Sequence, residues 1–113
     1  MVLTIIDSDR KKQKDSRVSI KQIAEYLSLE EGEKIFQKNI KYLRAARIEN
    51  IYYWLWKYTT TRSIDEYVLV RRVKKSEYAN PVYTLSCCYK DPDSSVDEML
   101  IAYHEKLSVS SYV

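Results

Sequence analysis

Glycine and proline are scarce in this chain of 113 residues, which contains only Gly32, Pro81 and Pro92 of these two types. Loops that cradle phosphate groups with backbone N–H donors need several closely spaced glycines. A Gly-rich phosphate-binding loop is therefore excluded by inspection.

Cysteine and histidine are also few. Cys87 and Cys88 are the only cysteines, and neighbours on an extended strand point to opposite faces, so a disulfide between them would distort the peptide. With His104 as the single histidine, a zinc site built from Cys and His lacks ligands. We expect two reduced thiols, one in the core and one outside, with no metal and no cofactor.

Residues that could carry catalysis are equally sparse. His104 stands beside Glu105 without a nucleophile near it in sequence, which is typical of an inert surface histidine. Asp91 and Asp93 flank Pro92, where turn formation explains them better than acid–base chemistry. We therefore expect that the protein is not an enzyme.

No apolar run approaches the roughly 20 residues of a membrane helix. The opening MVLTIID is too short, and too soon followed by charge, for a secretory signal. The length suits one domain. We expect a cytoplasmic protein without membrane contact.

Charge is unevenly distributed along the chain. Residues 1–75 hold 17 Lys and Arg against 10 Asp and Glu, whereas residues 76–113 hold 2 against 6. The first part therefore carries +7 and the second −4, although the whole chain carries only +3. This polarity favours an anionic partner for the first two-thirds of the molecule.

A basic N-terminal segment (1–18) is predicted to precede a single domain (19–113). The cations of the segment suit a charged linker or a nucleic-acid arm, and its opening MVLTII suits a short strand or the start of a helix. Ser19 and Gln22 match a capping box, which predicts a helix over residues 20–28. Its predicted core face is Ile20, Ile23, Ala24 and Leu27.

A second helix is predicted over residues 31–47. Phe36, Ile40 and Leu43 recur at spacings of four and three, which would place them on one helical face. The opposite side would collect Lys34, Gln37, Lys38, Lys41 and Arg44. Such a helix is either an ordinary solvated helix or one laid against an anionic partner.

After Asn50 the pattern changes to alternation. It predicts an antiparallel meander of three strands over residues 51–58, 66–74 and 82–89, with Arg62 at the tip of the first hairpin. The last predicted element is a helix over residues 95–107. Its apolar stripe, Val96, Met99, Leu100, Tyr103 and Leu107, suits either the core or the seam of a dimer.

The order of short helix, longer helix and hairpin resembles a winged helix-turn-helix DNA-binding domain. The resemblance rests on VSIKQIAEYLSL, on NIKYLRAARIEN and on the strands IYYWLWKY and EYVLVRR, about 55 residues in all. It implies an α+β fold with a short helix, a recognition-type helix, a three-stranded antiparallel meander and a C-terminal amphipathic helix.

The resemblance also implies a small transcriptional regulator that binds double-stranded DNA. The 31–47 helix would lie in the major groove and the 59–65 hairpin tip on the backbone. The DNA-binding residues would be Lys34, Gln37, Lys38, Lys41, Arg44 and Arg62. A homodimer through the C-terminal helix would match the symmetry of DNA half-sites.

The alternative is a protein-interaction module of a virus or mobile element that binds and inhibits a host complex. Its surface would be the strand face of Tyr52, Trp54, Trp56 and Tyr58, because Trp and Tyr are enriched at interface hot spots. The same face could instead pack against the C-terminal helix. The Tyr- and Lys-rich, Gly-poor composition is similar to that of small proteins of archaeal viruses and plasmids.

Overall fold

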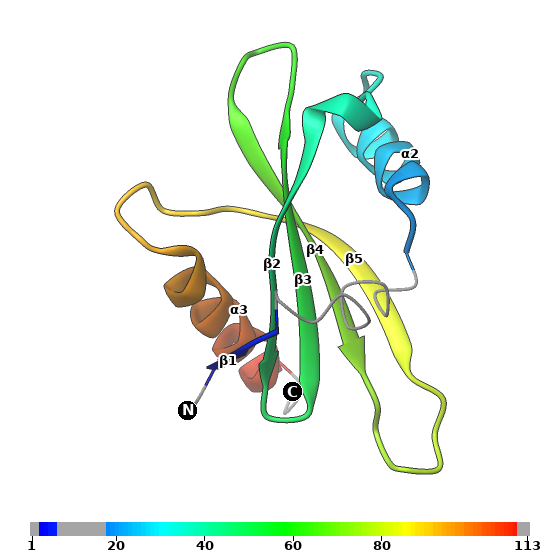
Figure 1. Ribbon diagram of the computed structural model, residues 1–113, viewed down its shortest axis with the longest axis vertical. Coiled ribbons are helices and arrows are strands. Elements are labelled where there is room, and N and C mark those ends of the chain that lie inside the picture. Colours follow the sequence, from blue (N-terminus) through cyan, green and yellow to red (C-terminus); the bar gives the residue numbers. More distant parts are fainter. Residues whose placement is uncertain (1–2, 7–17, 111–113) are drawn as a thin grey trace.

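A five-stranded antiparallel sheet with one helix on each face organises the chain (Figure 1). The computed structural model describes residues 3–6 and 18–110. The strands follow one another across the sheet in chain order: β1 (Leu3–Ile5), β2 (Ile40–Ile48), β3 (Ile51–Thr59), β4 (Asp65–Val73) and β5 (Val82–Cys88). The α+β class is confirmed, and the sheet has two strands more than the three expected.

Strands β3, β4 and β5 lie within a residue of the predicted ranges and pair antiparallel. The two faces of β3 are both buried, but under different helices. Trp54, Trp56 and Tyr58 pack with helix α2 (Ile20–Glu31), whereas Tyr53 and Leu55 pack with helix α3 (Val96–Ser110). The expectation that the Trp face packs against the C-terminal helix is therefore wrong, because that helix covers the opposite face.

Helix α2 begins as predicted and ends later. Ser19 accepts a hydrogen bond from the Gln22 N–H, and the Gln22 side chain accepts one from the Ser19 N–H, so the capping box is confirmed. The helix continues past residue 28 to Glu31. Gly32 ends it with φ at +67°, a left-handed conformation that L side chains rarely adopt.

The predicted helix over 31–47 is wrong, because most of this segment is extended. A 3₁₀ turn, η1 (Gln37–Asn39), leads into strand β2. A β-bulge between Tyr42 and Arg44 shifts the alternation by one residue. The extra residue Leu43 brings apolar positions to helix-like spacing, and pairing with β3 overrides the helix propensity of KYLRAAR.

The apolar stripe of α3 faces the sheet. Met99 and Leu100 are buried against Leu55 and Leu69, with Val96 and Tyr103 partly buried beside them. This agrees with the core alternative. His104 is completely buried rather than on the surface as expected, and its Nδ1 lies 2.6 Å from the Tyr53 hydroxyl.

Residues Leu3–Ile5 belong to the sheet. They pair with Ile48, Arg47 and Ala46, which agrees with the strand alternative for this part of the chain. Residues 7–17 of the expected basic segment lie outside the described residues. Neither α2 nor α3 is long and apolar enough to cross a membrane, and the described ranges contain no other α-helix.

The placement of α3 predicts a contrast between two leucines. Leu100→Ala should lower the free energy of unfolding by about 2–5 kcal/mol, because Leu100 is fully buried. Leu29→Ala should change it by about 0.5 kcal/mol or less, because Leu29 on α2 is 84% exposed. Urea denaturation of the two variants measures both. Equal losses would contradict the assignment of the α3 stripe to the core.

Candidate nucleic-acid interface

Three lysines surround one hollow where β2 and β3 lie beside the β3–β4 hairpin. The hollow has a volume of about 330 Å³ and is lined by Lys38, Asn39, Lys41, Lys57, Thr59 and Asp65. Lys41 on β2 and Lys57 on β3 lie directly opposite each other in the register. Asp65 compensates part of this charge, with a carboxylate oxygen 3.7 Å from the Lys57 Nζ.

A larger groove adjoins this hollow at Lys38. We call it the Phe36 groove; its volume is about 1170 Å³, and α2, Gly32 and the segment that leads to η1 form its walls. The Phe36 ring is 48% exposed. The Lys34 and Lys38 ammonium groups lie 5.2 Å and 5.7 Å from the ring centroid, so the groove combines an apolar surface with two cations.

A side-chain hydroxyl holds the segment that carries Lys34 and Phe36 against α2. Ser28 Oγ donates to the Ala24 carbonyl oxygen at 2.7 Å and accepts from the Ile35 N–H at 2.9 Å. Ile35 is buried in the same part of the core as Ile23 and Leu27 of α2. The chain after Gly32 is therefore fixed in an extended conformation, which presents Lys34 and Phe36 outward.

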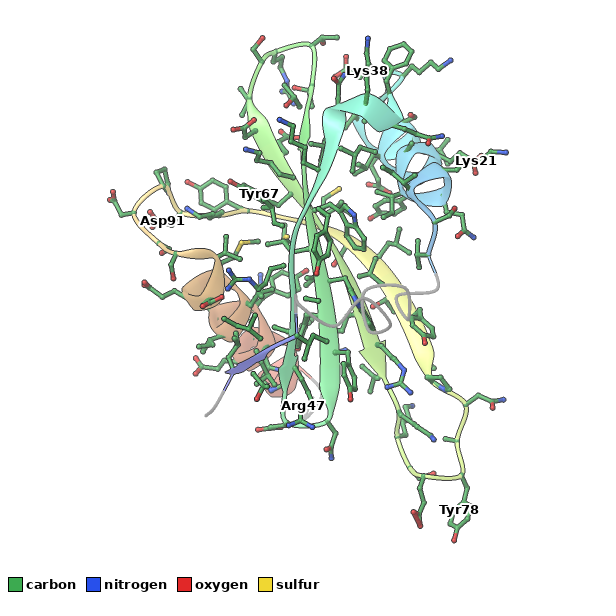
Figure 2. All side chains as sticks on the ribbon, in the orientation of Figure 1. Lys21, Lys38, Arg47, Tyr67, Tyr78 and Asp91 are labelled. Atoms are coloured by element: carbon green, nitrogen blue, oxygen red, sulfur yellow. The ribbon has the colours of Figure 1, made fainter. Side chains whose placement is uncertain are left out.

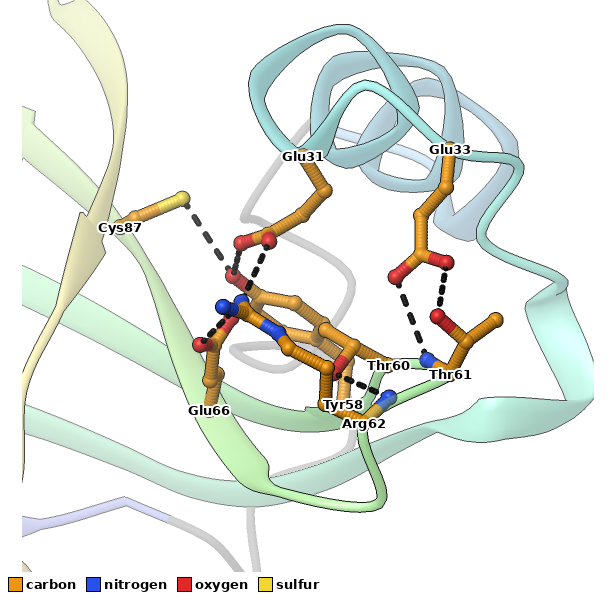
Figure 3. Close-up of polar contacts among 8 residues, drawn as sticks. All are labelled: Glu31, Glu33, Tyr58, Thr60, Thr61, Arg62, Glu66 and Cys87. Carbon is orange, nitrogen blue, oxygen red and sulfur yellow. Dashed lines mark hydrogen bonds and ion pairs between the residues drawn. The ribbon is translucent and has the colours of Figure 1, made fainter.

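Two carboxylates tie the end of α2 to the β3–β4 hairpin (Figure 3). Glu33 accepts hydrogen bonds from the Thr61 N–H at 3.2 Å and the Thr61 hydroxyl at 2.6 Å. Glu31 accepts one from the Tyr58 hydroxyl at 2.8 Å. Both acids are therefore bound within the protein.

The protonation of Glu31 depends on that of Glu66, because the two carboxyl groups interact at the end of α2. Their mutual hydrogen bonding lowers the pKa of Glu31 and raises the pKa of Glu66 from the ordinary value of 4.5. Arg62 lies beside both, with its Nη2 3.5 Å from Glu31 and 3.4 Å from Glu66. Burial raises the pKa of Tyr58, which keeps its hydroxyl a donor to Glu31.

The structure brings together four of the six residues that the sequence suggested. Lys34, Gln37 and Lys38 line the Phe36 groove, and Lys38 and Lys41 line the adjoining hollow. They come from a loop, a 3₁₀ turn and a strand instead of one helix face. The groove and the hollow meet at Lys38, which Figure 2 shows beside the end of α2.

Arg44 and Arg62 have other roles. The Arg44 guanidinium forms an ion pair with Asp97 in the first turn of α3, which links β2 to that helix. Arg62 forms ion pairs with Glu31 and Glu66, so the guanidinium group at the hairpin tip is already paired within the protein. Both arginines are therefore paired with carboxylates of the protein.

Sequence reasoning missed Phe36 and Lys57 as members of the site. Phe36 was assigned to an apolar helix face, although its position between Lys34 and Lys38 in KIFQK is an indication of a cation–aromatic cluster. Lys57 lies within an aromatic strand and meets Lys41 only through the register of β2 and β3. Nothing in the linear spacing of the two lysines shows that contact.

Neither the Phe36 groove nor the lysine hollow is lined by a cysteine. Cys87 and Cys88 are free and lie on opposite faces of β5, and burial raises the pKa of Cys88 to about 12, so it stays a thiol. The described residues contain no group of His, Cys, Asp and Glu side chains that could hold a metal ion. The site can therefore offer cations, amides and one aromatic ring to a partner.

Comparisons with known proteins do not assign the chain to a family. No family model matches the chain, and neither a curated protein nor a solved structure shows significant similarity to it.

The carboxyl pair predicts a specific pH dependence of stability. Glu66 binds its proton more tightly in the folded protein than in the unfolded chain, so stability falls as the pH rises from 4.5 through its raised pKa. Glu31 has the opposite shift, so its contribution is lost as the pH falls below 4.5 through its lowered pKa. Glu66→Gln should remove the fall above pH 4.5, because Gln does not ionise and still donates to Glu31.

Urea denaturation of parent and variant at several values between pH 4.5 and neutral pH measures this difference. Glu105→Gln on the exposed side of α3 is the matched control. Parallel stability curves for parent and Glu66→Gln would show that the interaction with Glu31 does not raise the pKa of Glu66.

Proposed function

We propose that the protein is a DNA-binding module, of the kind used by small transcriptional regulators, and that it grips the duplex with the Phe36 groove and the adjoining lysine hollow. One observation carries the proposal: Lys38, Lys41 and Lys57 line one hollow. Lys41 and Lys57 lie directly opposite each other on neighbouring strands. Four residues expected from the sequence to contact DNA lie at this surface, namely Lys34, Gln37, Lys38 and Lys41.

The opposed lysines support an anionic ligand. Like charges directly opposite each other on neighbouring strands destabilise a sheet. Of the three lysines of the hollow, Lys57 forms an ion pair with Asp65, at 3.7 Å, and Lys41 is exposed. A phosphate group placed between the two ammonium groups would replace repulsion with attraction, and would release condensed counterions from the DNA.

The mode of binding differs from that of a recognition helix. Strand β2 and the turn η1 supply most of these cations as flexible ammonium groups, so we expect most contacts to go to phosphate oxygens, which position a protein without reading sequence. Gln37 and Asn39 add side-chain amides, which can pair with adenine edges if they reach a groove. We therefore expect strong dependence on salt and weak preference for base sequence.

A protein partner is the second candidate function. The aromatic face expected to serve it is not accessible, because Trp54, Trp56 and Tyr58 are buried beneath α2. The observation that favours a protein partner is instead the exposure of Leu29 and Phe36 on the Phe36 groove. Such a partner would insert an apolar side chain there, and substitution of Leu29 would then weaken binding more than substitution of Lys41.

Dimerisation stays a prediction. The stripe of α3 that could form a dimer seam packs against the sheet, so a homodimer would have to use another surface. Sedimentation equilibrium with and without DNA tests this directly, because a regulator of palindromic sites would bind as two copies.

The DNA proposal predicts the behaviour of a double variant, Lys38→Gln with Lys41→Gln. Its affinity for duplexes of any sequence should fall, and the slope of log affinity against log salt should decrease by roughly 1.8, about 0.9 for each lost phosphate contact. Removal of Lys41 also removes the repulsion with Lys57, so the variant should fold at least as well as the parent. Fluorescence anisotropy with a labelled random-sequence duplex over a salt series measures both values.

Lys90→Gln is the matched control for lost charge. Lys90 donates to the Asp91 carbonyl oxygen at 3.2 Å, and Figure 2 shows Asp91 well away from Lys38. The control should keep the salt slope of the parent. An unchanged slope in the double variant, together with loss of a captured protein partner in Leu29→Asp, would replace the DNA proposal with the second candidate.

A further inference from the structure

Arginine and tyrosine alternate across the sheet at the end that α2 leaves uncovered. Arg47 on β2 lies opposite Tyr52 on β3, Tyr52 lies opposite Arg72 on β4, and Arg72 lies opposite Tyr83 on β5. Residues directly opposite on neighbouring strands point to the same face. We call these four residues the Arg–Tyr row.

The row lies on the face of Trp54, beyond the part that α2 covers. In Figure 1, α2 lies over the end of the sheet where the β3–β4 hairpin turns, and the β2–β3 turn and the β4–β5 hairpin form the opposite end. Arg47 and Lys38 accordingly lie toward opposite ends of the molecule in Figure 2. Arg47 lies six positions after Lys41 on β2, roughly 20 Å at the usual rise of a strand.

Packing fixes the geometry of the row. The Arg72 guanidinium lies 5.2 Å from the centroid of the Tyr52 ring. Tyr52 stacks on Trp54 with 6.0 Å between centroids and 19° between ring planes, and Tyr83 lies 6.4 Å from Trp54 at 30°. Because Trp54 is fully buried, it anchors both tyrosines, and Tyr52 positions the guanidinium of Arg72.

Among the described residues, the charge at this end of the sheet is positive. Arg47, Lys74 and Lys75 are exposed, and Arg72 is half-buried. Of the acids nearest in sequence, Glu49 has its carboxylate 3.6 Å from the His104 Nε2, on the side of α3. Glu77 lies on the β4–β5 hairpin loop, past the lysines. The row therefore presents cations and half-buried rings together.

We propose that the Arg–Tyr row binds unpaired nucleotides of a single-stranded nucleic acid. Bases stack on aromatic rings and on the planes of Arg guanidinium groups, and cations beside them contact the phosphates. Tyr83 and the guanidinium of Arg72 supply the stacking surfaces, while Arg47, Lys74 and Lys75 face the backbone. This site is separate from the lysine hollow proposed for duplex DNA, and its ligand differs because bases in a duplex stack on their neighbours, which hides their faces.

The experiment measures the affinity of the full chain for a labelled oligothymidylate of about 12 nucleotides, a length within the usual range of single-strand sites. Tyr83→Leu should weaken binding by roughly 5- to 150-fold, the loss of one stacked base. Tyr83→Phe should bind like the parent, because it keeps the ring. Arg72→Gln should also weaken binding, both through the lost charge and through the lost plane.

Arg71→Gln is the matched control, since Arg71 is the next residue on β4 and points to the opposite face, where its Nε lies 3.4 Å from the Tyr53 hydroxyl. It should keep the affinity for oligothymidylate. A second control is the double variant Lys38→Gln with Lys41→Gln, which should lose affinity for duplex DNA and keep it for the single strand.

Three outcomes overturn the proposal. The first is that the parent fails to bind oligothymidylate. The second is that Arg71→Gln weakens binding as much as Arg72→Gln. The third is that Tyr83→Leu leaves the affinity unchanged while Arg72→Gln lowers it. In the last case the row binds anions without reading bases. Loss of single-strand binding in the row variants alone would support this proposal whether or not the lysine hollow binds duplex DNA.

Discussion

The end of helix α2 is the constraint on which the arrangement of the surface depends. Gly32 turns the chain in the left-handed region, and the Ser28 hydroxyl then holds the Ile35 N–H at 2.9 Å. Continuation as a helix is thereby prevented, and the residues that follow run along the sheet as η1 and β2. Had they stayed helical, Lys41 could not face Lys57, because that contact exists only through the pairing of β2 with β3.

The helices cover the sheet unequally, and this determines what the surface can bind. Helix α2 buries Trp54, Trp56 and Tyr58 near one end of β3, and α3 buries Tyr53 and Leu55 on the reverse face. The cations of the lysine hollow and those of the Arg–Tyr row lie toward opposite ends of the sheet, outside the surface that the helices cover. One end offers ammonium groups, which suit phosphates, and the other offers rings and guanidinium planes, which suit exposed bases.

Local patterns predicted several elements of the fold. The capping box of Ser19 and Gln22, the alternation after Asn50 and the apolar stripe around Leu100 each depend on neighbouring residues, and each is present in the structure. The segment around Leu43 could not be predicted in this way, because a bulge changes its period and its pairing partner is not local. Burial of His104 and the ion pair of Arg44 with Asp97 also arise from tertiary contacts.

From the sequence, only the kinds of residue in the candidate site could be predicted, and not their arrangement. The basic first two-thirds of the chain and the cluster from Lys34 to Lys41 indicated an anionic partner. The partners of these cations could not be read from spacing, since Glu31 and Glu66 come from separate elements to neutralise Arg62. The Arg–Tyr row was hidden for the same reason, because each of its members comes from a different strand.

The most direct measurement is NMR mapping of backbone amide shifts during titration with a duplex that carries a single-stranded tail. The account predicts two separate groups of shifted amides: residues 34–41 with Lys57, which respond to the duplex, and Arg47, Arg72 and Tyr83, which respond only when the tail is present. Shifts confined to α3, or no shifts at either end of the sheet, would contradict it.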